Sequence, residues 1–126
     1  FAQACQAVPC LGTTHADYFN GPVPVTRELT PEEVAVEYER ATGRTLLDAL
    51  EGRPPLTMPA VLAAYHGPFA WGVTPDEAVD ANVVLECVAA MAFDTLALNP
   101  RRNGMPRAMR EKHFERKHGA DAYYGQ

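Results

Sequence analysis

His66 is the histidine whose surroundings most suggest a ligand-presenting position. It lies where the apolar stretch 58–65 meets HGPFAWG, a loop with two glycines and a proline. A rigid scaffold commonly holds functional side chains on such loops. A histidine at this position could equally bond a local backbone group. One histidine cannot form a metal site, because zinc takes three or four ligands. The other candidate ligands are distant in sequence: His15, Asp17, His113, His118 and the three cysteines. A metal site would therefore be assembled over long sequence distances, or would lack ligands.

A second polar cluster is GTTHADYF, residues 12–19. It places two threonines, His15 and Asp17 close together between apolar flanks. This pattern is typical of a turn closed by Asx and hydroxyl hydrogen bonds. The same residues could instead offer an acid or base, His15 or Asp17, beside hydroxyl donors. The sequence leaves both interpretations open.

The C-terminal stretch KHFERKHGADAYYGQ, residues 112–126, combines two histidines, two tyrosines and a basic run. Chain ends are usually poorly ordered unless they are tied down. A nucleic-acid-binding arm is one interpretation. However, Glu111 and Glu115 interrupt the basic residues, and a solvated helix face explains them, so we expect no nucleic-acid partner. A disordered tail has no use for paired aromatic side chains, so we expect Tyr123 and Tyr124 to dock, on this chain or on another subunit.

Composition limits the classes of protein to consider. The chain has 126 residues, the size of one domain, and a net charge of −5. Residues 101–118 hold seven Lys and Arg against two Glu, so the remainder is strongly acidic and does not favour nucleic acid. Three cysteines without paired spacing indicate reduced thiols in a cytoplasmic protein. No apolar run appears long enough to span a bilayer, so we expect no membrane partner. The chain begins with Phe, which suggests a fragment.

The elements that would position these groups alternate between helix and strand. Residues 1–29 have the character of strands and loops. Thr30 and Glu33 form the signature of a capping box and predict a helix that Gly43 would end. The stretch from Val61 to Tyr65 predicts a buried strand that runs into the His66 loop.

Two further helices are predicted in the second half. The longer begins at Thr74 and ends at Asn99-Pro100. Its predicted core face has four-residue spacing. The residues of this face are Val79, Val83, Cys87 and Met91, flanked by Val84 and Val88. The last helix runs from about residue 106 to 117, and Gly119 ends it. Together these patterns predict an α/β or α+β layered domain.

The stretches GTTHADYF, YHGPFAWG and KHFERKHGADAYYGQ occur in this order. With them the chain resembles the class II aldolase/epimerase family over essentially its whole length. The terminal AYYGQ is similar to the L-ribulose-5-phosphate 4-epimerase branch of that family. The resemblance implies an α/β/α layered fold with a central, mostly antiparallel sheet, here incomplete. It also implies a sugar-phosphate substrate and a homotetramer with active sites between neighbouring subunits.

The resemblance also implies roles for individual residues. His66 matches a ligand of zinc, with one ion per subunit. Asp17 and Tyr124 match the acid/base pair, and His113 matches a supporting catalytic residue; these would reach the metal of the adjacent subunit. Thr13 matches a residue near the substrate. The implied reaction interconverts L-ribulose 5-phosphate and D-xylulose 5-phosphate by retro-aldol cleavage of C3–C4 and re-addition.

Parts of the family pattern do not occur in this sequence. These are the Gly- and Ser-rich phosphate loops, an H-x-H pair of zinc ligands and a further acidic residue. We therefore expect residues 1–126 to be the C-terminal portion of a single class II aldolase/epimerase domain, inactive without its N-terminal half. A sugar-phosphate aldolase of the same family and a non-catalytic interaction module are the alternatives.

Overall fold

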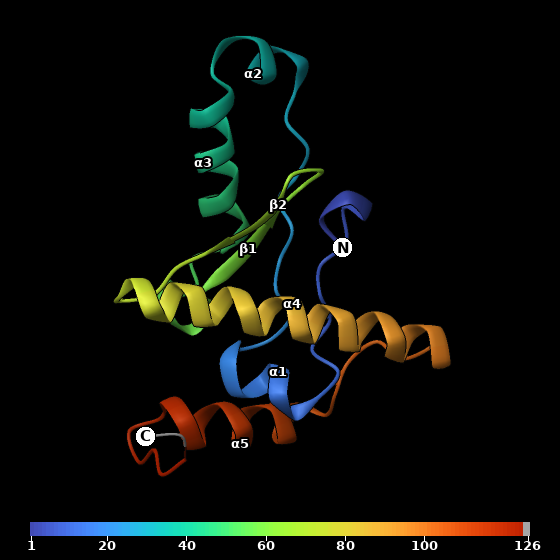
Figure 1. Cartoon of the computed structure of the whole chain (residues 1–126), viewed down its shortest axis with the longest axis vertical. Coiled ribbons are helices and arrows are strands. Elements are labelled where there is room, and N and C mark those ends of the chain that lie inside the picture. Colours follow the sequence, from blue (N-terminus) through green and yellow to red (C-terminus); the bar gives the residue numbers. More distant parts are fainter. Residues whose placement is uncertain (125–126) are drawn as a thin grey trace.

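The computed structural model describes residues 1–124 and combines helices with one small sheet (Figure 1). The elements, in chain order, are η1 (Ala2–Ala4), α1 (Thr13–Tyr18), α2 (Pro31–Val36), α3 (Tyr38–Ala49), η2 (Pro55–Thr57), β1 (Ala60–Ala63), β2 (Gly67–Ala70), α4 (Pro75–Leu98) and α5 (Arg107–His118). In the view of Figure 1, α2 and α3 lie at one end of the molecule and α1 and α5 at the other, with α4 crossing between them. This is a mixed α/β arrangement, consistent with an incomplete α/β layered fold.

The predicted helix starts are confirmed because capping is local chemistry. The Thr30 hydroxyl accepts the Glu33 N–H at 3.2 Å, and the Glu33 carboxylate accepts the Thr30 N–H at 2.9 Å, which closes the capping box. Thr74 caps α4 in the same way through the Glu77 N–H. The predicted stop at Gly43 is wrong. The chain breaks at Glu37 instead, and α3 runs through Gly43.

The expectation of strands and loops over residues 1–29 is partly wrong, because α1 occupies 13–18. Strand-like pairing does occur on either side of this helix. Val8 bridges Val23 in antiparallel sense, and Val25 bridges Leu62 in parallel sense. A helix of six residues is too short to show a helical period in sequence.

Strands β1 and β2 form an antiparallel hairpin in which Val61 faces Phe69 and Ala63 faces Gly67. The predicted strand to Tyr65 therefore ends two residues early, at Ala63. Tyr65 adopts a left-handed backbone, φ 61°, which turns the chain toward His66. β1 is buried along its whole length, as the apolar run predicts.

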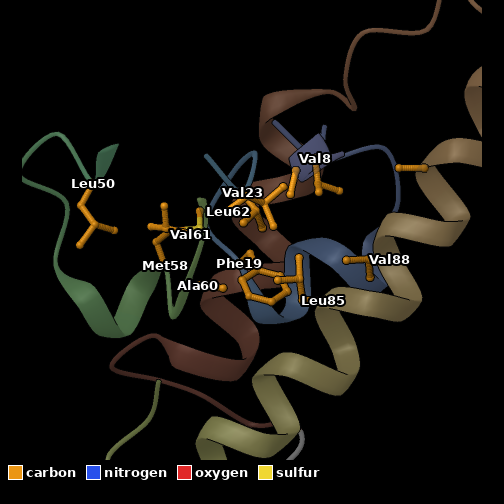
Figure 2. Close-up of a cluster of buried hydrophobic side chains, with 12 residues drawn as sticks. Val8, Phe19, Val23, Leu50, Met58, Ala60, Val61, Leu62, Leu85 and Val88 are labelled. Atoms are coloured by element: carbon orange, nitrogen blue, oxygen red, sulfur yellow. The ribbon is translucent and has the colours of Figure 1, made fainter. Parts of the chain in front are cut away.

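The core lies where α1, β1 and α4 meet (Figure 2). Phe19, Met58 and Leu85 are its largest fully buried side chains. Figure 2 shows the Phe19 ring beside Leu85 of α4. Helix α1 is thus fixed to the body of the molecule by the residue that follows it.

The face by which α4 packs differs from the predicted one. The predicted face is largely exposed, with Val79, Val83 and Met91 at 61%, 55% and 52% of their surface. The buried face is shifted toward one predicted flanking residue, Val88, and consists of Ala81, Leu85, Val88 and Ala92. The helix is apolar on both sides, so its period alone does not select the side that faces the core.

Helix α4 is also long and apolar enough to cross a membrane by length and composition. The expectation that no apolar run reaches such a length is therefore wrong for this element. One such helix is weak support for a membrane span, because the core helix of a globular protein can pass the same test. In this structure Leu85 and Val88 of α4 pack into the core.

Candidate active site

Asp17 is the centre of a charged cluster between α1 and α5, which pack side by side (Figure 1). Its carboxylate is 12% exposed. Nδ1 of His113 lies 3.1 Å from Asp17 Oδ1. Arg116 donates to the same oxygen from Nε at 3.1 Å and from Nη2 at 3.0 Å, and to Oδ2 from Nη2 at 3.0 Å. His113 and Arg116 are three residues apart on α5, so both face α1.

The C-terminal tail folds back onto the same arginine. The main-chain carbonyl of Arg116 accepts the N–H groups of Tyr123 at 2.9 Å and Tyr124 at 3.1 Å. The guanidinium carbon of Arg116 lies 4.0 Å from the centre of the Tyr124 ring. The expected docking of the tyrosine pair therefore occurs, at least for Tyr124, on this chain. Gly125 and Gln126 lie outside the described residues.

The structure thus brings three of the predicted site residues, Asp17, His113 and Tyr124, together around Arg116. Arg116 itself was missed, because its charge looked like part of a solvated helix face. His118 was also left without a role. Its Nε2 lies 2.8 Å from the main-chain oxygen of Asp17, and its ring stacks on Phe114 at 4.5 Å. His118 therefore secures the backbone of α1 next to the carboxylate.

The two candidate proton carriers of GTTHADYF, His15 and Asp17, take different environments. His15 is buried, and its Nε2 donates to the Gly21 carbonyl at 2.8 Å. Burial lowers the pKa of His15 below its usual 6.5, outweighing the opposite effect of the Gly21 hydrogen bond. His15 is therefore a neutral core residue near neutral pH. Asp17, in contrast, meets the cations of α5.

Thr13 begins α1, one turn before Asp17, and is half-buried. The hydrogen bonds of the Asp17 cluster do not include it. The role of Thr13 near the substrate therefore stays a prediction. The structure shows only that Thr13 and Asp17 are on the same short helix.

His66 lies in the exposed turn between β1 and β2. Its Nδ1 is 3.3 Å from the Tyr38 hydroxyl, and its ring centre is 5.6 Å from that of Phe69. With Tyr38 and Arg27 it lines a cavity of about 230 Å³. Sequence reasoning missed Tyr38, which is 28 residues away on α3.

Strained backbone adjoins His66. Tyr65 has a positive φ, which is rare for a bulky residue and commonly accompanies functional sites. Its N–H donates to the Ala2 carbonyl at 3.0 Å, and its hydroxyl donates to Glu28 Oε1 at 2.9 Å. The hydrogen bond to Glu28, followed by the interaction with Cys5, raises the pKa of Tyr65 to about 12. These contacts keep the turn fixed.

The residues present do not by themselves fit a zinc ion. Within residues 1–124, no group of three or more His, Cys, Asp or Glu side chains is placed to hold a metal. His66 has an aromatic ring and a phenol as its neighbours rather than further ligands. It could supply one ligand of a site completed by other residues.

His66 and the Asp17 cluster lie apart in the molecule. In Figure 1 the turn between β1 and β2 and the α1–α5 pair are on opposite sides of α4. The predicted metal ligand and the predicted acid–base residues of one chain are therefore not neighbours.

A family model described as Class II Aldolase and Adducin N-terminal domain matches residues 1–93. The matched region contains Asp17 on α1, the His66 turn and most of α4. The α5 helix and the tail, with His113, Arg116 and Tyr124, lie beyond it.

Proposed function

The chain belongs to the class II aldolase and adducin N-terminal domain family, and from this premise we propose that it is part of a zinc-dependent sugar-phosphate 4-epimerase. The proposed reaction interconverts L-ribulose 5-phosphate and D-xylulose 5-phosphate, a conversion used in both arabinose and ascorbate catabolism. The observation that carries the proposal is the gathering of Asp17, His113 and Tyr124 around one arginine. The resemblance to the family implies that Asp17 and Tyr124 are the acid/base pair and that His113 supports them.

The chemistry explains why two proton carriers are needed. The hydrogen on C4 of the substrate is not adjacent to the C2 carbonyl, so its direct removal gives no stabilised carbanion. Loss of the C4 hydroxyl proton instead allows the C3–C4 bond to break, giving the enediolate of dihydroxyacetone and glycolaldehyde phosphate. The aldehyde rotates, C3 attacks its other face, and the new C4 alkoxide takes a proton. Each face of the aldehyde therefore needs its own acid–base group.

We assign these groups to Asp17 and Tyr124, with His113 supporting Asp17. The Asp17 carboxylate accepts hydrogen bonds from the Arg116 guanidinium, and Nδ1 of His113 lies 3.1 Å from the same carboxylate. The face of the Tyr124 ring lies against the guanidinium of Arg116, which holds the phenol close to Asp17's partner.

The negative charge of the enediolate is the reason for proposing zinc as the cofactor. His66 would be one ligand, and residues other than 1–124 would complete the coordination. Because His66 and the Asp17 cluster are separated in one chain, we also propose that the His66 of one subunit works with the Asp17 cluster of the next. A cytoplasmic homotetramer with shared active sites would have this arrangement.

Substrate comparison tests the activity. The natural polypeptide, purified from its source cells, would be assayed on L-ribulose 5-phosphate and on L-fuculose 1-phosphate. Epimerisation of the first without cleavage of the second supports the proposal, as does loss of activity with a chelator and its return with zinc. Net cleavage of L-fuculose 1-phosphate would instead identify an aldolase of the same family.

We further propose that residues 1–126 form the C-terminal portion of this enzyme domain. The exposed apolar side chains of α4, such as Val79, Val83 and Phe93, support this, because a larger domain would cover them. Intact mass spectrometry of the natural polypeptide is the test. A mass well above the 13.8 kDa of these residues agrees with the proposal, and a mass near that value contradicts it.

The exposed face of α4 also favours a second candidate, a non-catalytic interaction module that docks through this face. The activity assay separates the two candidates. Such a module would turn over neither sugar phosphate, with or without zinc.

A further inference from the structure

We propose that Arg116 is the positioning residue that holds Asp17 and Tyr124 in one arrangement. This inference rests on the proposed function, since it presupposes that these two groups exchange protons with the substrate. Sequence motifs assign no role to Arg116, and the family match does not reach it. The structure places it between the two groups, with separate contacts to each.

The first contact is the forked bond to Asp17. Two guanidinium nitrogens, Nε and Nη2, reach the carboxylate at 3.0–3.1 Å. This planar fork fixes the orientation of the carboxylate as well as its charge, which the ammonium of a lysine does not do. The Arg116 side chain is 22% exposed, so water screens the pair less than it screens a surface pair.

The hydrogen bonds are distributed unequally over the two carboxylate oxygens. Oδ1 of Asp17 meets His113 Nδ1 and two nitrogens of Arg116, whereas Oδ2 meets Arg116 Nη2 alone. A carboxylate oxygen has about two lone-pair sites. Oδ2 therefore keeps the capacity to accept a further proton, and Arg116 determines which oxygen this is.

The second contact is with the tail, and it has two parts. The guanidinium carbon lies 4.0 Å from the Tyr124 ring centre, on the face of the ring. The Arg116 carbonyl accepts the N–H groups of Tyr123 and Tyr124. One residue thus fixes the path of the tail through its backbone and the plane of the Tyr124 ring through its side chain.

The positive charge of Arg116 maintains its contacts with Asp17 and Tyr124. The hydrogen bond to Asp17 raises the pKa of Arg116 above its already high ordinary value, so the side chain is a cation throughout the working range of pH. Arg116 can keep its contacts with the Tyr124 ring and the Asp17 carboxylate without changing its own protonation state during turnover. Arg116 can therefore position both groups without itself exchanging a proton.

The test uses Arg116→Ala, with Arg107→Ala as the matched control, in the natural full-length enzyme. Arg107 is on the same helix, and its side chain is 82% exposed. It pairs with Glu111 rather than with Asp17 or Tyr124. We expect Arg116→Ala to lower kcat about 100-fold with KM changed less than about threefold, since acid–base groups typically contribute this much. Added guanidinium should restore part of kcat in Arg116→Ala, and Arg107→Ala should match the wild type.

Hydrogen exchange at the amides of Tyr123 and Tyr124 gives a readout independent of activity. We expect faster exchange in Arg116→Ala and wild-type exchange in Arg107→Ala. If Arg116→Ala fails to fold, Arg116→Lys replaces it, with the same expected direction of both effects but no rescue by guanidinium.

The outcomes separate the inference from the proposed function. Unchanged tail exchange, or unchanged kcat, in the Arg116 variant overturns the positioning role. A loss of kcat that guanidinium does not relieve in a folded Arg116→Ala also overturns it. A wild-type enzyme without epimerase activity refutes the proposed function and with it the catalytic purpose of the arrangement, while the exchange data still decide whether Arg116 holds the tail.

Discussion

Nδ1 of His113 lies 3.1 Å from Oδ1 of Asp17, although 96 residues separate them in the sequence. Helix α5 has to fold back onto α1 to make this contact, so the pair depends on the tertiary structure. The family resemblance implies related roles for Asp17 and His113. Their contact leads us to expect that the two residues act as one unit.

A double-mutant cycle tests this unit. Asp17→Asn and His113→Asn should each lower kcat/KM by about 100-fold, and the double variant should be little worse than the more damaged single variant. The reason is that neither residue can support the other once its partner is gone. Steady-state assay of the four proteins checks it. Multiplicative losses in the double variant would show that the two side chains act independently.

Phe19 should be the most sensitive aromatic position for stability. It is fully buried beside Leu85 and holds α1 on the core. Phe19→Ala should lower the free energy of unfolding by about 3–5 kcal/mol, because it removes a large side chain and leaves a cavity. Phe93→Ala is the control: Phe93 is 67% exposed. Its substitution should change stability by less than about 0.5 kcal/mol. Urea unfolding measures both, and equal effects would contradict the packing described.

His15 predicts a pH dependence of stability. Its pKa in the folded state is below the 6.5 of the unfolded chain, so the unfolded state binds more protons between these two values. The stabilisation should be complete above about pH 6.5 and should be lost as pH falls from there through the folded pKa. Urea unfolding of the wild type and His15→Gln over this range measures it. Glutamine can keep the bond to Gly21 without titrating. A wild type that gains stability relative to His15→Gln on acidification would refute the prediction.

Gly43 should accept alanine with a gain in stability. It lies inside α3, and a Cβ added there would meet nothing within 4 Å. Alanine favours a helix over glycine by about 1 kcal/mol, so Gly43→Ala should raise the free energy of unfolding by up to that amount. Thermal unfolding measures the change. A loss of stability would mean that the α3 interior is not helical at this position.

Gly72 should behave in the opposite way. A Cβ there would overlap the Glu77 side chain and lie 2.8 Å from the backbone nitrogen of Ala78, in the first turn of α4. Gly72→Ala should therefore cost about 1–3 kcal/mol, as overpacking typically does. Thermal unfolding beside Gly43→Ala makes the comparison. A neutral substitution would show that the approach of this loop to α4 is not close.

The parts predicted well from sequence depend on local chemistry. The caps at Thr30 and Thr74 need only partners three residues away, and Gly119 ends α5 as expected. The buried strand at 60–63 follows from an uninterrupted apolar run. The site residues Asp17, His113 and Tyr124 are implied by the resemblance to the family, and the structure shows the contacts that bring them together.

The features that the sequence did not predict depend on residues that are distant in the sequence. Arg116 bonds to a residue 99 positions away, so its charge alone could not be distinguished from a solvated face. Gly43 was expected to end a helix, but Ala41 and Thr45 on either side are buried, and this packing sustains the helix. The core face of α4 could not be selected because both sides are apolar.

We expect the tail to act in catalysis through the hydroxyl of Tyr124. The most direct test compares Tyr124→Phe with Tyr123→Phe in the natural full-length enzyme, with L-ribulose 5-phosphate as substrate. Tyr123 is the matched control, because it is the neighbouring tyrosine, is 70% exposed and shares the backbone bond to Arg116. The account predicts that Tyr124→Phe folds and assembles normally but loses about 10²–10⁴ in kcat, whereas Tyr123→Phe keeps wild-type activity. A Tyr124→Phe enzyme with kcat within about threefold of the wild type would contradict the assignment of this residue to proton transfer.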